Sequence, residues 1–276
     1  PDGGWRTLAR AAPLLVLFAL VPQSSRADVA KAMASALNTK LAYVITGTGD
    51  VDAMSRAGLY GLGLALKQRT AYEPTEPIGI DIERDDLTFY PLLYWPMVAS
   101  QKNLSPTAIA KLDNFMRNGG TILFDTRDGN LSALKGNAPG QAALKRTLGK
   151  LDVPPLEPIP PDHVLTKAFY LLRDFAGRWD GGQVWVEAIP TPDPDLGPQP
   201  ARGGDGVSPV IVGGNDWASA WATNSEGRPI AAVVPGGERQ RETAYRFGVN
   251  VVMYTMTGNY KTDQVHVPAL LERLGN

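Results

Sequence analysis

The stretch Asn118–Asp128, Asn-Gly-Gly-Thr-Ile-Leu-Phe-Asp-Thr-Arg-Asp, decides the fold class of this chain. It opens with Asn118–Gly119, a pair that is typical of a helix end. A run of four apolar or β-branched residues follows at Thr121–Phe124. Such a run predicts a strand covered on both faces, which is the usual environment in a parallel sheet.

Charged residues follow this strand directly. In open α/β sheets, ligands bind beyond the carboxyl ends of the strands. Asp125, Arg127 and Asp128 would stand there and form the floor of a binding site. The alternative is a strand end at which these side chains pair with one another in salt bridges.

The composition narrows the function classes. With 276 residues, 43% apolar and 20% charged, the chain is long enough for a sizeable core and is globular in type. Its net charge of -1 gives no reason to expect a nucleic-acid partner. Cysteine is absent, which excludes disulfides and a thiolate nucleophile. His163 and His266 lie far apart and show no metal-ligand spacing, so we expect no metal and no cofactor.

Strand and helix patterns alternate along the rest of the chain. Further strands are expected at Leu41–Thr46, Pro77–Asp81, Pro91–Trp95, Gln183–Ile189 and Pro209–Val212, and helices after Asp50, after Ser105, at Ala138–Lys150 and from Glu238 to Thr257, with Gly258 as the end. The alternation predicts a three-layer α/β domain with a mostly parallel sheet, spanning residues 41–276 as a single unit.

Prolines predict where this order is interrupted. The run Val153–Pro161 is expected to be irregular, because proline removes hydrogen-bond donors and restricts its neighbours. The stretch Pro229–Val234 is interpreted as a short strand.

The amino-terminal segment, residues 1–27, is signal-like or transmembrane. Arg6 and Arg10 precede an apolar run, Ala11–Val21, and small residues come after it. A buried helix is the alternative. The basic residues on its amino side predict contact with the inner membrane through residues 8–22 and a periplasmic globular domain. Residues 28–40 are interpreted as a linker helix.

The turn Gly47–Asp50 is similar to the start of a dinucleotide-binding fingerprint. The third glycine is missing, and Asp50 and Asp52 would repel a pyrophosphate. We therefore expect a tight strand-to-helix turn here and no nucleotide.

Two further motifs carry candidate site residues. Asp162 and His163 follow the proline run and form either an acid–base pair or a loop anchor. Asn215, Asp216 and Trp217 follow a strand and a Gly-Gly turn. They would bring a carboxylate and an indole to the sheet edge, or cap the next short helix.

The last helix supplies the remaining candidates. Arg246 can pair with Glu242 four residues earlier, or reach one of the aspartates. The amides of Gly236 and Gly237, at the helix start, can hold an anion. Aromatic residues near these motifs are expected to serve in packing rather than as a sugar platform: Tyr94, Trp95, Trp185 and Trp217.

Several separated motifs resemble the domain family of unknown function 4159, over roughly residues 41–260: Phe89–Tyr94, Gly119–Asp125, Pro158–His163, Tyr245–Asn250 and Thr257–Tyr260. The resemblance implies a flavodoxin-like, class I glutamine amidotransferase-like fold. It also implies the carboxy-terminal part of a longer membrane protein similar at its start to the aerotolerance regulator BatA. MoxR-type ATPases and von Willebrand A-type proteins are the partners implied by that setting.

Amidotransferases of that fold use a cysteine on a strand-to-helix elbow, and this chain has no cysteine. A serine elbow would need the pattern Gly-x-Ser-x-Gly. Gly206–Val210 comes nearest, but it lacks the second glycine, and Ser208 precedes a strand instead of following one.

Three functions remain open. The leading hypothesis is a noncatalytic binding or assembly domain of a membrane-anchored bacterial cell-envelope protein. The first alternative is a hydrolase of an envelope polymer or a small amide or ester, in which Asp125, Asp216 and His163 converge. The second is a carbohydrate- or anion-binding module that uses Trp217, Arg127 and the Gly236–Gly237 turn.

Overall fold

The computed structural model describes the backbone of residues 40–134, 138–188 and 207–274, and the side chains of these ranges apart from 132–134 and 257–274. The chain divides into two units, residues 1–37 and 38–276. The amino-terminal segment 1–27 and nearly all of the linker 28–40 lie outside the described residues.

The described part is built from alternating strands and helices. In chain order these are β1 (Lys40–Val44), α2 (Gly49–Arg69), β2 (Thr75–Ile80), β3 (Leu92–Pro96), α3 (Pro106–Arg117), β4 (Thr121–Asp125), the 3-10 helix η1 (Gly129–Leu134), α4 (Pro139–Leu148), β5 (Leu156–Pro158), the 3-10 helix η2 (Val164–Lys167), β6 (Trp185–Glu187), β7 (Val210–Gly213), α5 (Trp217–Trp221) and α6 (Glu238–Leu274).

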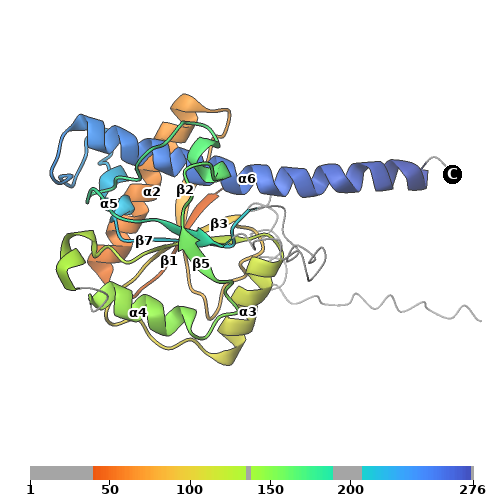
Figure 1. Ribbon diagram of the computed structural model, residues 1–276, viewed down its shortest axis with the longest axis horizontal. Coiled ribbons are helices and arrows are strands. Elements are labelled where there is room, and N and C mark those ends of the chain that lie inside the picture. The colour runs from red at the N-terminus through yellow and green to blue at the C-terminus, as the bar shows by residue number, and fades with distance from the viewer. Residues whose placement is uncertain (1–39, 135–137, 189–206, 275–276) are drawn as a thin grey trace, which may run out of the picture. The chain divides into compact units, whose positions relative to one another are not determined.

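These strands form one sheet in the order β2-β1-β3-β4-β7-β6-β5 (Figure 1). The first five in this order are parallel, and β6 and β5 are added in antiparallel fashion beyond β7. With β7 as the fifth parallel strand, the order is that of flavodoxin-like folds. The predicted three-layer α/β class is confirmed.

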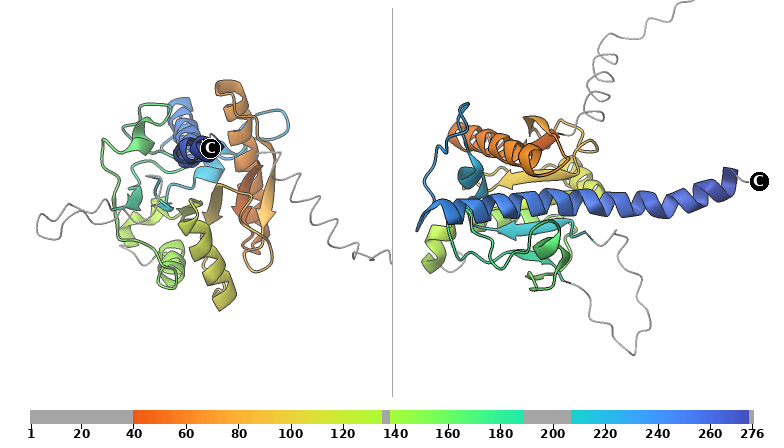
Figure 2. Two further views of the ribbon diagram at one scale, coloured as in Figure 1. Left: turned by 90° about the vertical axis from the view of Figure 1, so that its right-hand side faces the viewer. Right: turned by 90° about the horizontal axis from the view of Figure 1, so that it is seen from above.

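Helices cover both faces of the sheet (Figure 2). On one face, α3 and α4 pack against a cluster that includes Ile122 and Phe124. On the other face, α2, α5 and α6 pack against a cluster that includes Leu123 and Ile211. Every residue of β4 is buried, as the run Thr121–Phe124 predicted.

Small residues let the helices of the second face approach closely. Gly58 and Gly61 of α2 lie against the backbone of α5, where an added methyl group would collide with Ala218 and Trp221. The glycines therefore fix where α5 lies, and α5 begins at Trp217, the last residue of a candidate motif.

Three local predictions were wrong. The proline run contains β5, because a short strand at a sheet edge tolerates Pro158, whose missing N–H is not needed by a second neighbour. The stretch Pro229–Val234 forms isolated bridges instead of a strand. Helix α6 does not end at Gly258 but continues to Leu274, since one glycine costs a helix only about 1 kcal/mol.

Candidate functional site

Asp125 is the centre of the candidate site at the carboxyl edge of the sheet. Its side chain is completely buried. One carboxylate oxygen accepts hydrogen bonds from the amides of Arg127 (3.0 Å) and Asp216 (3.1 Å). The other accepts from the Tyr94 hydroxyl (2.8 Å) and the Trp217 amide (2.8 Å). Four donors from three parts of the chain thus converge on one carboxylate.

These bonds give Asp125 a structural task. Tyr94 belongs to the neighbouring strand β3, and the amides of Asp216 and Trp217 belong to the turn between β7 and α5. Buried backbone N–H groups need partners, and a carboxylate in this place supplies them. Asp125 therefore ties three segments together at the point where parallel strands end.

The charge of this site is costly to bury. Burial, followed by repulsion from Asp216, raises the pKa of Asp125 to about 7, although the hydrogen bonds from Trp217, Tyr94 and Arg127 act in the opposite direction. Burial and the nearby Asp125 carboxylate also hold the pKa of Tyr94 well above its usual range. The neutral Tyr94 hydroxyl can turn so that its oxygen accepts a hydrogen bond from a protonated Asp125 carboxyl, so both protonation states of Asp125 find a partner.

Asp216 has an unusual backbone and one unsatisfied oxygen. Its φ is 52°, and its carboxylate contacts the Arg178 guanidinium at 3.4 Å. The other carboxylate oxygen is buried and has no hydrogen-bond partner among the residues that the structure describes. Asp216 occupies the N-cap position of α5, as one interpretation predicted, and its carbonyl accepts a hydrogen bond from the Ala220 amide (3.3 Å), but its side chain makes no cap hydrogen bond. Arg178 was not predicted from the sequence.

Arg127 and Asp128 do not form the salt bridges that one interpretation of the sequence predicted. No ion pair in the described ranges joins Asp125, Arg127 and Asp128. Asp128 instead accepts a hydrogen bond from the Gln141 amide (2.9 Å) in the first turn of α4, and acts as a distant N-cap. Arg127 has a φ of 60°, and its carbonyl accepts a bond from the Trp179 indole (3.2 Å).

Asn215 and Trp217 are both fully buried. The Asn215 amide donates to the carbonyl of Phe175 (2.6 Å), and the Trp217 indole donates to the same carbonyl (3.1 Å). Trp217 also stacks on Phe247. Both side chains hold the loop before β6 against the turn after β7, and Trp217 offers no exposed ring to a sugar.

His163 lies at the other end of the sheet. Its Nδ1 accepts a hydrogen bond from the Leu165 amide (3.1 Å), which makes it a loop anchor, and Asp162 beside it is exposed. The His163 ring contacts Tyr254, whose hydroxyl accepts a bond from the Ser208 amide before β7 begins. From there to the carboxyl end of β7 is roughly 15 Å at the rise of a strand. The structure therefore does not bring His163 to Asp125 and Asp216.

Ser208 has a structural role as well. Its hydroxyl donates to the carbonyl of Val210 (2.6 Å) and accepts from the amide of Glu187 (2.9 Å). Both bonds are made at the amino end of β7, so this hydroxyl takes no part in the carboxyl edge.

Arg246 pairs with none of the site aspartates in the described residues, whereas the glycine turn is linked to the site, because the Gln240 side chain that binds Gly236 also donates to the carbonyl of Arg178. Arg246 pairs with Glu242 (2.9 Å), as its spacing predicted, and Glu242 also pairs with Arg69 (2.8 Å). The amide of Gly236 donates to the Gln240 side chain (2.9 Å), so one of the two predicted anion-binding donors is already used.

The first strand-to-helix turn is also closed by a side chain. One oxygen of the Asp52 carboxylate accepts from the Thr46 amide (2.8 Å), and the other from the Gly47 amide (3.0 Å). Those amides lie where a Rossmann-type turn would hold a phosphate. The segment is thus the tight strand-to-helix turn that the sequence predicted, and the Asp52 side chain closes it.

Fold and site together define a flavodoxin-like α/β domain whose carboxyl edge is closed by hydrogen bonds within the chain. The sequence profile of the family described as "Domain of unknown function (DUF4159)" matches residues 40–256. The chain therefore belongs to the DUF4159 family. None of the curated proteins matches the sequence.

Proposed function

We propose that this chain is a noncatalytic binding or assembly domain of a membrane-anchored protein of the bacterial cell envelope. One observation carries the proposal. Asp125, which stands where ligands bind in this class of sheet, is fully buried and spends both oxygens on four hydrogen bonds within the chain. A general base must reach its proton within about 3 Å or through one water, and this carboxylate presents neither oxygen to solvent.

The membrane setting is supported by the sequence of residues 8–22 and by the family setting described above. Among the residues that the structure describes, no helix is long and apolar enough to cross a membrane, and residues 8–22 lie outside them. In this proposal the globular domain is periplasmic, has an amidotransferase-like fold without amidotransferase chemistry, and assembles with MoxR-type ATPases or von Willebrand A-type proteins.

A turnover experiment tests the noncatalytic part. The full chain in detergent micelles is assayed with chromogenic esters, amides and glycosides and with cell-wall fragments, beside the Asp125→Asn and Asp216→Asn variants. We expect no turnover that depends on either carboxylate. Turnover by the wild type that both folded variants lose would overturn the proposal in favour of the hydrolase.

A fractionation experiment tests the anchor. Membranes from cells that express the full chain are washed with carbonate, in parallel with a variant that lacks residues 8–22. The full chain is expected to stay in the pellet, and the variant is expected to leave it. Equal release of both proteins would contradict membrane anchoring through this segment.

A further inference from the structure

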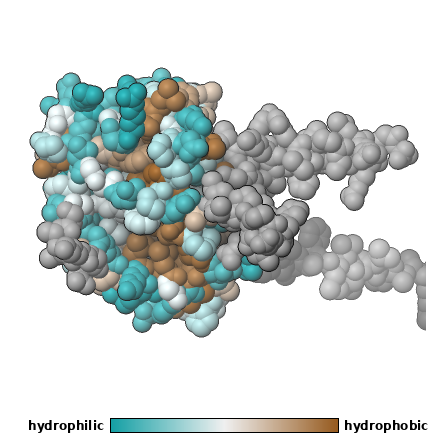
Figure 3. Space-filling model, in the orientation of Figure 1, coloured by the Kyte–Doolittle hydropathy of each residue, from teal (hydrophilic) through white to brown (hydrophobic). Residues whose placement is uncertain are grey.

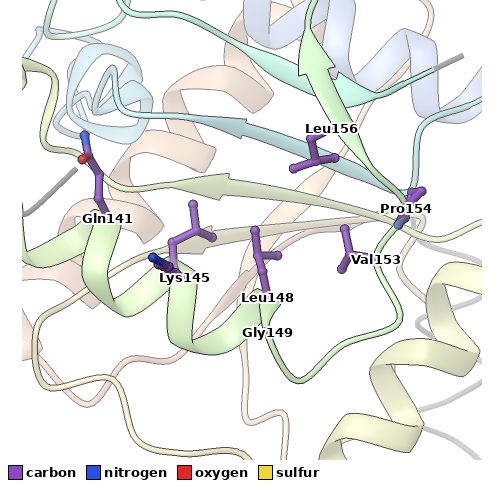
Figure 4. Close-up of a pocket in the computed structure, with 8 residues that line it drawn as sticks. Gln141, Lys145, Leu148, Gly149, Val153, Pro154 and Leu156 are labelled. Carbon is purple, nitrogen blue, oxygen red and sulfur yellow. The ribbon is translucent and has the colours of Figure 1, made fainter. Parts of the chain in front are cut away.

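An apolar groove lies between α4 and the edge strand β5. It has a volume of about 480 Å³ and is open to solvent (Figure 4). Its apolar lining comes from the end of α4, the loop after it and the start of β5: Leu144, Leu148, Val153, Pro154 and Leu156. Figure 3 shows apolar residues gathered in the lower part of the same face.

The groove exists because the sheet extends further than its helical cover. Strands β6 and β5 continue the sheet beyond β7, and α3 and α4 are the described helices on this face (Figures 1 and 2). Trp185 of β6 pairs with Val212, whose side chain belongs to the core under α3 and α4. Residues opposite one another in a sheet share a face, so Trp185 points to the α4 side, where it is 39% exposed.

Side chains of β5 extend this uncovered surface. Leu156 pairs with Glu187 and Pro158 pairs with Trp185, so both face the same side as Trp185. Helices in a three-layer α/β fold cover the apolar faces of the sheet. The groove beside α4 is thus the place where the next helix of this layer would lie.

The edge strand itself does not favour strand addition. Strand β5 has three residues, follows Pro154 and Pro155, and ends at Pro158, which has no N–H to donate. Short edges guarded by proline resist pairing with another strand. An amphipathic helix needs no backbone donors and is bound through its apolar stripe alone.

A positive charge at the rim of the groove sets a second requirement for the helix that it would bind. Lys145 is exposed at the rim and is the one charged residue among those that line the groove in the described part of the chain. We infer that the groove docks an amphipathic helix of a partner protein, with apolar residues at positions i, i+3, i+4 and i+7 and a carboxylate facing Lys145. The inference rests on the proposed function and names the kind of partner that the binding domain takes.

A pair of synthetic helical peptides tests this inference on the full chain in detergent micelles. Both carry leucine at i, i+3, i+4 and i+7; one has glutamate beside the leucine stripe, and the other has lysine in the same positions. Fluorescence anisotropy measures their binding. The glutamate peptide is expected to bind about two- to fivefold more tightly than the lysine peptide at low salt, the range of a surface ion pair.

Three variants make the test specific. Lys145→Glu should reverse the preference between the peptides, and Leu148→Ser should weaken both at least about tenfold, as loss of a central apolar contact does. Lys150→Glu is the matched control, because Lys150 is exposed and lines a separate hollow on the other side of α4. It should leave the preference at the wild-type ratio.

The contrary results are distinct from failure of the proposed function. Binding of neither peptide, equal binding of both, or no response to Leu148→Ser would overturn the inference and leave the noncatalytic proposal standing. In cells, a photo-cross-linking residue at Val153 should capture an acidic amphipathic helix of another protein. The same cross-linking residue placed at Arg56 on α2 serves as the control. Capture of a second copy of the chain, or of the chain's own residues, at Val153 would also overturn the inference. So would a set of captured proteins at Val153 that does not exceed the set captured at Arg56.

Discussion

Replacing Asp125 with asparagine should remove a specific pH dependence of stability. Burial raises the pKa of Asp125 from 3.8 to about 7 in the folded protein. Between those values the folded state keeps a proton that the unfolded chain has lost. Stability from this group is therefore fully present below pH about 4 and is lost as pH rises through about 7.

The magnitude follows from the size of the shift. About three pKa units correspond to about 4 kcal/mol of unfolding free energy in total, of which about 2.5 kcal/mol falls between pH 5 and pH 8. Urea unfolding of residues 38–276, followed by tryptophan fluorescence at both pH values, measures it. Because asparagine does not titrate, the Asp125→Asn variant should not show this loss of about 2.5 kcal/mol in unfolding free energy between pH 5 and pH 8.

A surface variant serves as the control. Glu76→Gln removes an exposed carboxylate that forms a solvent-exposed ion pair with Arg56, so its stability should follow the wild type within about 0.5 kcal/mol at each pH. If Asp125→Asn and the wild type lose the same stability between pH 5 and pH 8, the account of the buried carboxylate is wrong.

Other buried contacts give further predictions that urea unfolding of residues 38–276 can check. Tyr94→Phe should cost about 1.5–3 kcal/mol, because it removes a buried hydrogen bond to a carboxylate; a loss below 0.5 kcal/mol would contradict this bond. Asp128→Ala should cost about 1 kcal/mol by removing the cap of α4, and amide exchange at Gln141 should accelerate. Asn250→Ala should cost about 2–4 kcal/mol, since Asn250 accepts from the Tyr170 amide and donates to the carbonyls of Tyr170 and Leu165; wild-type stability would refute that role.

The fold class was predictable because its signals are local. The run Thr121–Phe124 is apolar on both sides of the strand, and two-sided burial is the mark of a central parallel strand. Two adjacent residues, Ser105 and Pro106, predict where α3 begins. The Ser105 side chain accepts a hydrogen bond from the Ala108 amide, as expected of an N-cap.

The strand order was not predictable in the same way. Periodicity reports which face of a strand is buried and does not report its neighbours. Strand β5 was missed because its prolines suggested a loop, although a sheet edge needs fewer donors.

The sequence predicted where the candidate site lies, but it did not predict which groups its carboxylates contact. Asp125 and Asp216 meet because β4 and β7 are adjacent parallel strands whose carboxyl ends lie at one edge. The partners that decide what these carboxylates do come from elsewhere: Tyr94 is 31 residues from Asp125, and Arg178 is 38 residues from Asp216. The one available signal was a tyrosine inside an apolar strand, whose hydroxyl needs a partner when buried.

Amide hydrogen exchange at the carboxyl edge tests the central claim most directly. The amides of Arg127, Asp216 and Trp217 all donate to the buried Asp125 carboxylate. If this edge is closed, the three amides exchange only when the whole domain unfolds, as slowly as core amides of β4. Fast exchange at these amides while the β4 core stays protected would mean that the edge opens to solvent, and would contradict the claim that Asp125 holds the domain together instead of serving a reaction.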